Sequence, residues 1–387
     1  MIPVKYNYRN LVVRKATTIA AAFGLALVVF VFAAAQMLSN GLTKAYGRSA
    51  SPESAIVLRK GSDNELSSGI EETQVNLVVA QAKQVGAARE PAAIGEVLAV
   101  ILLDKVGTTG LSNVTVRGVP ENVYEFRPTV KIVDGRAAKP GTDEVVVGEA
   151  IRGRFHGLDI GQKFELKKNR AVTVVGVFSD GGTSFESEVW SDIHTLRTAF
   201  GREGYVSSIR VRLDAAAKLD AFKALVESNR QLGLMVMGER EFYAKQSEMT
   251  ADFLTVLGTI IALLFSIGAM IGATITMNAQ VANRQREIGT LRALGFSKTS
   301  ILLSFLLESI VLAILGGGVG ALASLALKFV HITLLNSATF AEVVFGFEPT
   351  PAILVRAIVL AGGMGVIGGF LPAIRAARVS PIEAMRA

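Results

Sequence analysis

Residues 253–277 have the sequence FLTVLGTIIALLFSIGAMIGATITM, a stretch without a single charged side chain. Three further apolar blocks lie at 16–38, 301–330 and 352–371. A bilayer core of ~30 Å is spanned by about 20 apolar helical residues, and each block reaches that length. The sequence therefore predicts a membrane protein with four transmembrane α-helices, one before and three after a long polar segment.

The composition excludes several other classes of protein. Half of the 387 residues are hydrophobic and 19% are charged, whereas an average soluble chain is roughly 25% charged. The absence of Cys excludes disulfides, thiol catalysis, thiolate metal sites and haem attachment through cysteine. Only three histidines are present, which leaves little for a His-rich metal site.

The first apolar block, 16–38, has two interpretations. Basic residues and no acidic ones precede it, as in a signal peptide, and Ala33 and Ala35 offer a small-x-small cleavage pattern. Its apolar run is longer than the 7–15 residues of a signal core. This length favours a retained membrane anchor over a cleaved signal.

The distribution of charge predicts the orientation of the chain. Segments 1–15, 278–300 and 372–387 together hold 11 basic and 2 acidic residues, whereas segment 39–252 holds 27 basic and 28 acidic residues. The loop 331–351 has no Lys or Arg. Because cytoplasmic loops carry the excess of Lys and Arg, we expect both termini and 278–300 in the cytoplasm. The high pI reflects this topology and does not indicate a nucleic-acid partner.

The polar segment 39–252 is predicted to be a large extracytoplasmic α+β domain inserted between the first and second spans. Strand-like runs bounded by turn signals are separated by helical periodicity at 71–85, 91–104 and 215–229. Such a mixture indicates a mostly antiparallel sheet. Trp190, the single tryptophan, is either part of an exposed contact loop or, more commonly for this residue type, packed in the interior.

Residues 239–252 continue into the second span without Pro or Gly. They predict one long helix, a stalk between the outer domain and the membrane. The alternative is an ordinary juxtamembrane helix.

No catalytic, cofactor-binding or metal-binding pattern is present. The chain has no G-x-x-x-x-G-K-[S/T] stretch that would cradle a nucleotide phosphate, and no H-E-x-x-H, G-x-S-x-G or EF-hand pattern. Adjacent carboxylates such as Glu71 and Glu72 are typical of a solvated surface. The sequence therefore predicts a protein that is not an enzyme by itself.

Small residues recur at helical spacing in three of the four spans. Such G-x-x-x-G pairs let membrane helices approach closely, which indicates either general close packing or a bundle that associates or moves. The pairs are Gly268 with Gly272, Gly316 with Gly320, and Gly365 with Gly369.

Glu308 lies about seven residues, ~10 Å at 1.5 Å per residue, inside the third span. An ionisable group in hydrocarbon is a functional candidate by default. The alternative is a structural ion pair with a nearby arginine, Arg284, Arg286 or Arg292. We favour the ion pair, because no other titratable groups stand in line for a proton relay.

The stretch 283–299 between the second and third spans predicts a short amphipathic helix. Ile288, Leu291 and Leu294 or Gly295 fall on one face. A short cationic helix in this position either lies on lipid head groups or docks into the groove of a partner. Composition does not separate these two possibilities.

Three motifs resemble one known family. The string R-E-I-G-T-L-R-A-L-G-F-S at 286–297 resembles the coupling-helix signature of MacB/FtsX-type ABC transporter permeases. Glu308 followed by Gly316-Gly317 is similar to that family's E-x(7)-G-G pattern, and 372–386 resembles its closing P-x-x-x-A-x-x-x-x-P-x-E-A-L-R motif, with Met385 in place of Leu. Segment 39–252 resembles the MacB-like periplasmic core domain, and lipoprotein-release permeases are relatives.

The resemblance implies an inner-membrane permease subunit of an ABC complex, in which a separate cytoplasmic ATPase binds ATP and Mg²⁺. It also implies a second permease copy or a sister permease, and leaves a periplasmic adaptor open. The residues it assigns to the coupling helix are Arg284, Arg286, Glu287, Ile288, Gly289, Leu291, Arg292, Leu294 and Gly295.

Two outputs fit this resemblance. The first is export or extraction of a peptide, drug, lipid or lipoprotein by mechanical transmission to the outer domain. The alternative is an FtsX-like signalling scaffold that activates a periplasmic partner, such as a cell-wall hydrolase, without transport. The size of segment 39–252 favours the first, and the sequence does not name the substrate.

Overall fold

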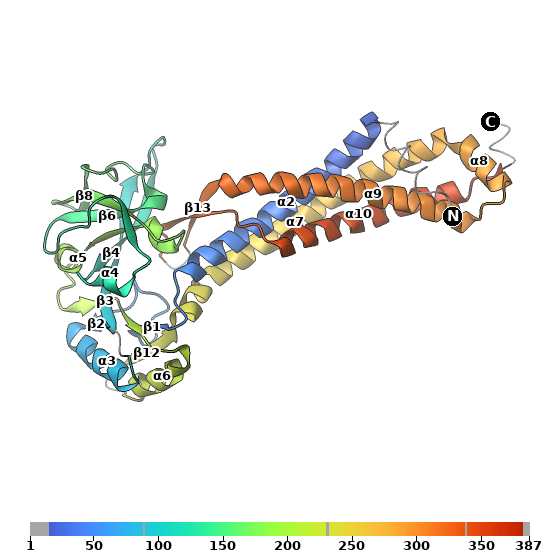
Figure 1. Ribbon diagram of the computed structural model, residues 1–387. Coiled ribbons are helices and arrows are strands. Elements are labelled where there is room, and N and C mark those ends of the chain that lie inside the picture. The colour runs from blue at the N-terminus through green and yellow to red at the C-terminus, as the bar shows by residue number, and fades with distance from the viewer. Residues whose placement is uncertain (1–14, 88–89, 230–231, 337–338, 382–387) are drawn as a thin grey trace. The chain divides into compact units, whose positions relative to one another are not determined.

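The computed structural model describes residues 15–87, 90–229, 232–336 and 339–381 (Figure 1). The chain divides into two compact units. One comprises Met1–Asn40, Asp252–Val330 and Gly346–Ala387, and the other comprises Gly41–Ala251 and His331–Phe345. The basic N-terminal segment and residues Glu383 to Arg386 of the closing motif lie outside the described residues.

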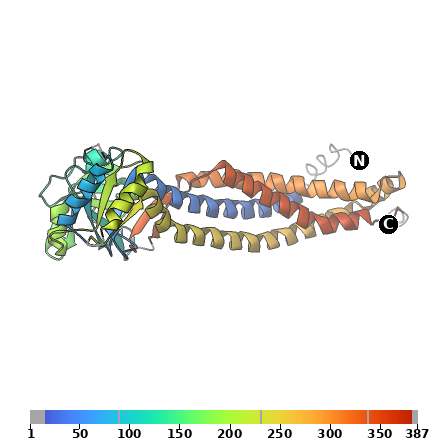
Figure 2. The same ribbon diagram turned by 90° about the horizontal axis from the view of Figure 1, so that it is seen from below.

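The first unit contains the membrane-spanning helices. Four helices of the described residues are long and apolar enough to cross a bilayer, and they run side by side in both views (Figures 1 and 2). They are α2 (Lys15–Arg48), α7 (Glu239–Asn283), α9 (Lys298–Ser324) and α10 (Pro351–Ala377). The prediction of one span followed by three is confirmed.

The helices extend beyond their apolar blocks. α2 continues to Arg48, and α7 is a single helix of 45 residues that begins at Glu239. No Pro interrupts α7, so its backbone hydrogen bonds continue from the polar segment into the apolar one. α9 is followed by a 3-10 turn, Leu325–Phe329, and Thr350 caps the start of α10 by accepting a hydrogen bond from the Ile353 amide.

The second unit is built on a ten-stranded sheet in the order β12-β1-β11-β3-β4-β9-β6-β8-β5, with β7 on β8. The pairs β4–β9 and β6–β8 are parallel and the other described neighbours are antiparallel, as predicted. The strands are β1 (Ser54–Arg59), β3 (Ala93–Asp104), β4 (Leu111–Val119), β5 (Lys131–Gly135), β6 (Glu144–Gly148), β7 (Lys163–Lys167), β8 (Arg170–Ser179), β9 (Glu188–Asp192), β11 (Ser208–Arg212) and β12 (Leu234–Gly238).

One half of this sheet follows a β-α-β-β-α-β order. β1, α3 (Glu72–Gln84), β3, β11, α6 (Leu219–Ser228) and β12 succeed one another, with the remaining strands inserted between β3 and β11. α3 and α6 lie together beside β1 and β12 (Figure 1). Both helices bury apolar side chains in the main core of this unit, among them Val78 and Phe222.

Smaller elements complete the second unit. β2 (Ile70–Glu71) pairs with β10 (Tyr205–Val206). Two short helices, α4 (Val123–Phe126) and α5 (Ile193–Phe200), follow β4 and β9, and short 3-10 turns lie at Glu149–Ile151, Ser184–Ser187 and Ala216–Lys218. Asp192 caps α5 by accepting bonds from the amides of His194 and Thr195.

The structure differs from the sequence-based expectation in two segments. Residues 91–104, predicted to be helical, form the long strand β3, because β3 pairs along its length with β4 and sends Val97, Ala99 and Ile101 into the core. The predicted loop 331–351 contains a hairpin of β13 (His331–Leu335) and β14 (Glu342–Gly346), most of which belongs to the second unit.

Candidate coupling site and buried charge cluster

A short helix, α8 (Gln285–Ala293), lies between α7 and α9. It is separated from α7 by Arg284, whose ψ of 14° departs from helical geometry. Gly295, with φ +95°, ends the turn after α8 in a conformation that favours glycine. Ser297 then caps α9 by accepting a hydrogen bond from the Ser300 amide.

The predicted coupling residues divide between two environments. Ile288 and Gly289 are buried, and Leu291 packs against the same apolar cluster as Ile288. Leu294 follows the last residue of α8 and is 72% exposed, although the sequence pattern places it on the Ile288 face. The exposed members of the set are Arg286, Glu287, Leu294 and Gly295, whereas Arg292 is partly buried.

Arg284 and Glu308 form a buried ion pair. Nη1 of Arg284 lies 3.1 Å from Oε2 of Glu308, and each side chain is 5% exposed. Nε of Arg284 lies 3.3 Å from the largely exposed carboxylate of Glu287, and its guanidinium group stacks 4.9 Å from the ring centre of Phe305. Arg284 therefore connects the start of α8 to the interior of α9.

Two of the glycine pairs mark helix contacts. Gly316 and Gly320 on α9 face the backbone of Ala22 and Ala26 on α2. A methyl group on Gly316 would lie 2.6 Å from the carbonyl oxygen of Ala22. These two glycines therefore let α9 approach α2 to within backbone contact.

The other two pairs have different surroundings. Gly365 and Gly369 on α10 face Ser309 and its neighbours on α9, and the hydroxyl of Ser309 donates to the carbonyl of Gly365 at 2.7 Å. A methyl group added to Gly268 or Gly272 on α7 would have no described atom within 4 Å, and both glycines line an apolar groove of about 480 Å³ between α2 and α7. Two pairs thus pack this bundle, and the third borders a groove.

The second unit contains a set of buried charges that the sequence analysis does not single out. We call it the charge cluster. Its members come from β3, β4, β9, β11, the start of α7 and two connecting loops: Glu65, Glu96, Arg117, Arg127, Glu188, Arg210 and Glu239.

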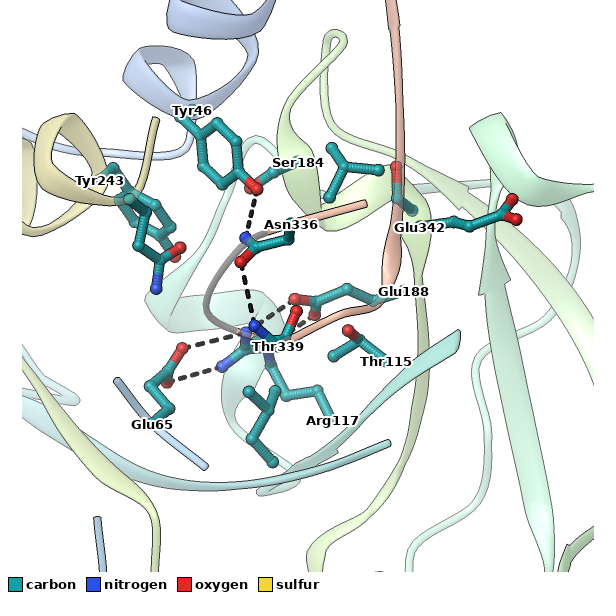
Figure 3. Close-up of a pocket in the computed structure, with 14 residues that line it drawn as sticks. Tyr46, Glu65, Thr115, Arg117, Ser184, Glu188, Tyr243, Asn336, Thr339 and Glu342 are labelled. Atoms are coloured by element: carbon teal, nitrogen blue, oxygen red, sulfur yellow. Dashed lines mark hydrogen bonds and ion pairs between the residues drawn. The ribbon is translucent and has the colours of Figure 1, made fainter. Parts of the chain in front are cut away.

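Arg117 is surrounded by three carboxylates. Its Nε lies 2.7 Å from Glu188, and its Nη1 lies 2.8 Å from Glu96 and 3.0 Å from Glu65. Figure 3 shows the guanidinium group between Glu65 and Glu188. Such charge-assisted bonds satisfy groups that would otherwise be costly to bury.

Arg210 connects this cluster to α7. It is fully buried and bonds Glu65 and Glu239, each at 3.0 Å, and its Nη2 donates to the hydroxyl of Tyr243 at 3.2 Å. Glu239 also accepts a bond from the Ser51 amide at 3.1 Å. The first residues of α7 are therefore fixed to the sheet by ionic contacts.

The arginines keep the buried carboxylates ionised. Burial alone would raise the pKa of Glu65, but the guanidinium groups of Arg117 and Arg210 hold that pKa well below its usual value. Burial likewise opposes ionisation of Glu96, and Arg127, Arg117 and Arg210 lower its pKa. Both carboxylates are charged at neutral pH.

Trp190 lies in the interior beside this cluster. It is fully buried, its Nε1 donates to Glu188 at 2.9 Å, and its ring centre is 4.5 Å from that of Phe178. The packed interpretation of Trp190 is therefore correct, and the exposed contact loop is not formed. This tryptophan is a spectroscopic reporter of the cluster.

A small polar cavity of about 30 Å³ adjoins the cluster, lined among others by Tyr46, Arg117, Tyr243 and Asn336 (Figure 3). This volume corresponds to about one water molecule. Among the described residues, no group of three or more His, Asp or Glu side chains is placed to hold a metal ion.

A sequence signal for the charge cluster does exist. Glu96, Arg117 and Arg210 each interrupt an otherwise apolar or small-residue strand, as in IGEVLAV, VTVRGV and SIRVR. A charge at an inward position of a strand requires a buried partner. The partners lie far away along the chain, so the pattern predicts that partners exist without identifying them.

The chain thus has the architecture of a multi-pass membrane protein with a large α+β domain between its first and second spans, and comparisons with known proteins agree with it. Residues 16–229 match the MacB-like periplasmic core domain, and residues 259–381 match the FtsX-like permease C-terminal domain. The chain belongs to the MacB/FtsX-type family of permeases.

Among its curated relatives are proteins named macrolide export ATP-binding/permease protein MacB. The one from Neisseria gonorrhoeae is 28% identical over 287 residues, which are 69% of this chain and 42% of that relative. The one from Hahella chejuensis is 30% identical over 295 residues, 70% of this chain and 43% of the relative. The matched region thus spans less than half of the length of these relatives.

Solved structures with weak overall similarity include two extracytoplasmic regions. The periplasmic region of MacB from Actinobacillus actinomycetemcomitans has a TM-score of 0.37 at 14% identity, covering 51% of this chain and 94% of that one. The extracellular domain of the noncanonic ABC-type transporter YknZ from Gram-positive bacteria has a TM-score of 0.36 at 17% identity. The match covers 48% of this chain and 99% of that one.

Proposed function

We propose that the chain is the membrane subunit of an ABC transporter and that it transmits ATP-driven motion of a cytoplasmic ATPase subunit to its extracytoplasmic domain. The observation that carries this proposal is the arrangement of α8. Its inner residue Ile288 packs in an apolar cluster with residues of α7, α9 and α10, its entry is fixed by the Arg284–Glu308 pair, and Leu294, directly after its last residue, is 72% exposed. An exposed apolar residue beside charges is typical of a docking helix.

The lengths of the helices support transmission. α7, which precedes α8 in the chain, is one helix of 45 residues, roughly 67 Å long. Its far end is held to the sheet by Arg210 through Glu239 and Tyr243. A force passed from α8 to the end of α7 therefore reaches buried ionic contacts along a single helix.

In this proposal the ATPase subunit binds ATP and Mg²⁺, and the residues of this chain transmit the resulting motion. Both termini and α8 face the cytoplasm of an inner-membrane protein, in agreement with the charge bias. The work done is export or extraction of a substrate from the outer side, and macrolide export in the names of the relatives gives one candidate class. A second permease copy or a sister permease would complete the complex.

The test is an ATPase assay on the complex in proteoliposomes. Alanine at Arg286, Glu287 and Leu294 together is expected to abolish the effect of the permease on the hydrolysis rate, while the chain still inserts. An unchanged rate would exclude α8 as the coupling element. Deletion of 39–252 tests the role of the outer domain in transport. Transport that is retained after the deletion would place the substrate path within the membrane helices.

A further inference from the structure

The hairpin β13–β14 is embedded in the extracytoplasmic unit. Val344 belongs to the main apolar core of that unit, and Ala341, Val343 and Phe345 are also buried. A loop that only joined two membrane helices would have no need of such burial, since loops ordinarily lie at the surface.

Polar contacts hold the hairpin to separate elements of the domain. Nζ of Lys105, which follows β3, lies 2.6 Å from Oε1 of Glu342. The side-chain amide of Asn113 on β4 donates to the carbonyl of Phe340 at 2.9 Å.

Two further contacts reach other parts of the same unit. The amide of Val344 donates to the hydroxyl of Ser187 at 2.9 Å, beside the charge cluster. The side-chain amide of Asn336 donates to the hydroxyl of Tyr46, near the end of α2 (Figure 3). Tyr46 in turn lies 6.1 Å from the ring of Tyr243 on α7.

The hairpin is also joined closely to the spans that flank it in the chain. Only residues 347–350 separate β14 from α10, and they reach at most roughly 18 Å when fully extended. Glu348 within this linker is fixed, because its amide donates to the carbonyl of Met37 at 3.1 Å and its carbonyl accepts from Asn40 at 2.9 Å. So short a linker absorbs little displacement of α10.

We propose that the hairpin β13–β14 is a third transmission element, which couples α9 and α10 to the extracytoplasmic domain in addition to α2 and α7. This inference rests on the proposed function, since it concerns the same ATP-driven motion. Glu342 and Asn336 are its positioning residues. The chain passes between its two units at four points, and two of them flank this hairpin.

The experiment uses the full chain in complex with its ATPase. Because the natural sequence has no Cys, cysteines at the exposed Lys223 on α6 and the exposed Val355 on α10 accept two spin labels specifically. The distance between the labels is measured with and without ATP. We compare the wild-type background with an insertion of about eight Gly and Ser residues after Gly346, which lengthens the linker and removes no hairpin contact.

The insertion is expected to reduce the ATP-driven change in label distance, because only α2 and α7 then transmit it, whereas the same insertion between the exposed Lys168 and Asn169 should preserve it in full. Glu342→Lys should also reduce the change, and Glu342→Lys combined with Lys105→Glu should restore it. Trp190 fluorescence like that of the wild type shows in each variant that the domain is folded.

Three outcomes are distinguishable. If the ATP-driven change in label distance is the same in the wild type, in the linker insertion and in Glu342→Lys, the hairpin has no role in transmission. The proposed function would still stand. A wild-type complex without any ATP-driven change would contradict both. A reduced change in the two variants with rescue by the charge exchange would support the hairpin as a transmission element.

Discussion

The guanidinium group of Arg284 lies 3.1 Å from the carboxylate of Glu308, and both side chains are almost completely buried. The first residue stands between α7 and α8 and the second lies within α9. The pair therefore fixes the direction in which α8 leaves α7. The exposed face of α8 depends on this geometry.

Removing one member of this pair should be costly. Glu308→Ala leaves Arg284 as a buried charge without its main partner, and we expect a loss of about 3–5 kcal/mol of stability. Thermal unfolding in detergent measures it. Glu287→Ala is the control, because Glu287 is 57% exposed and contacts the same arginine, so a change of at most about 1 kcal/mol is expected. Equal losses in the two variants would contradict the account.

The two faces of α8 should separate stability from coupling. Ile288 is 1% exposed, and Ile288→Ala is expected to cost about 2–5 kcal/mol of stability. Leu294→Ala should change stability by no more than about 0.5 kcal/mol and still weaken binding of the ATPase. Thermal unfolding and co-purification of each variant check both expectations. If Leu294→Ala is destabilised and still co-purifies with the ATPase, Leu294 serves packing and not docking, and the assignment is wrong.

The contact between α9 and α2 depends on the absence of a side chain at Gly316. Gly316→Ala is expected to cost about 1–3 kcal/mol, because its methyl group meets the backbone of Ala22. Gly318→Ala, two residues away with no described atom within 4 Å of the added methyl group, should instead stabilise α9 by up to about 1 kcal/mol. The measurement is the unfolding temperature of each variant in detergent. Equal changes in the two variants would argue against close packing of α9 on α2.

The sequence predicts the spans and misses the buried charges for physical reasons. Hydropathy identifies a transmembrane helix from local composition alone, so α2, α7, α9 and α10 are recognised. The partners of Arg117 and Arg210 lie more than twenty residues away along the chain: Glu96 and Glu188 in other strands, Glu65 in a loop and Glu239 at the start of a helix. Tertiary pairing decides these contacts, and a charge within an apolar strand indicates that a partner exists without identifying it.

The same limit explains β3 and the partner of Glu308. The apolar run at 91–104 is compatible with either a helix or a buried strand, and pairing with β4 decides the outcome. Three arginines near Glu308 are equivalent in the sequence. The break between α7 and α8 at Arg284 selects one of them.

The charge cluster should make stability depend on pH. The pKa of Glu65 is lower in the folded chain than its usual value, so the folded state binds fewer protons than the unfolded state at acidic pH. Its contribution is present at neutral pH and is lost as the pH falls below about 4.3, the usual value for Glu. The stability difference between wild type and Glu65→Gln should therefore be largest at pH 7 and shrink below about pH 4.3.

Urea unfolding of the full chain in detergent, followed by Trp190 fluorescence, measures this difference. Trp190 is the single tryptophan and bonds Glu188 of the cluster, so its signal reports the relevant region. A difference that stays constant from pH 7 to well below pH 4.3 would show that ionised Glu65 does not stabilise the domain.

The most direct test of the central claim is purification of the tagged chain from native membranes in mild detergent, followed by an ATPase assay on the proteins that accompany it. We predict a stoichiometric ATPase with wild type and with the control Gly318→Ala, and its loss when residues 286–294 are replaced by alanine. Two results would contradict coupling to an ATPase through residues 286–294. The first is that no ATP hydrolysis accompanies the wild-type chain, and the second is that the 286–294 variant brings down as much ATP hydrolysis as the wild type.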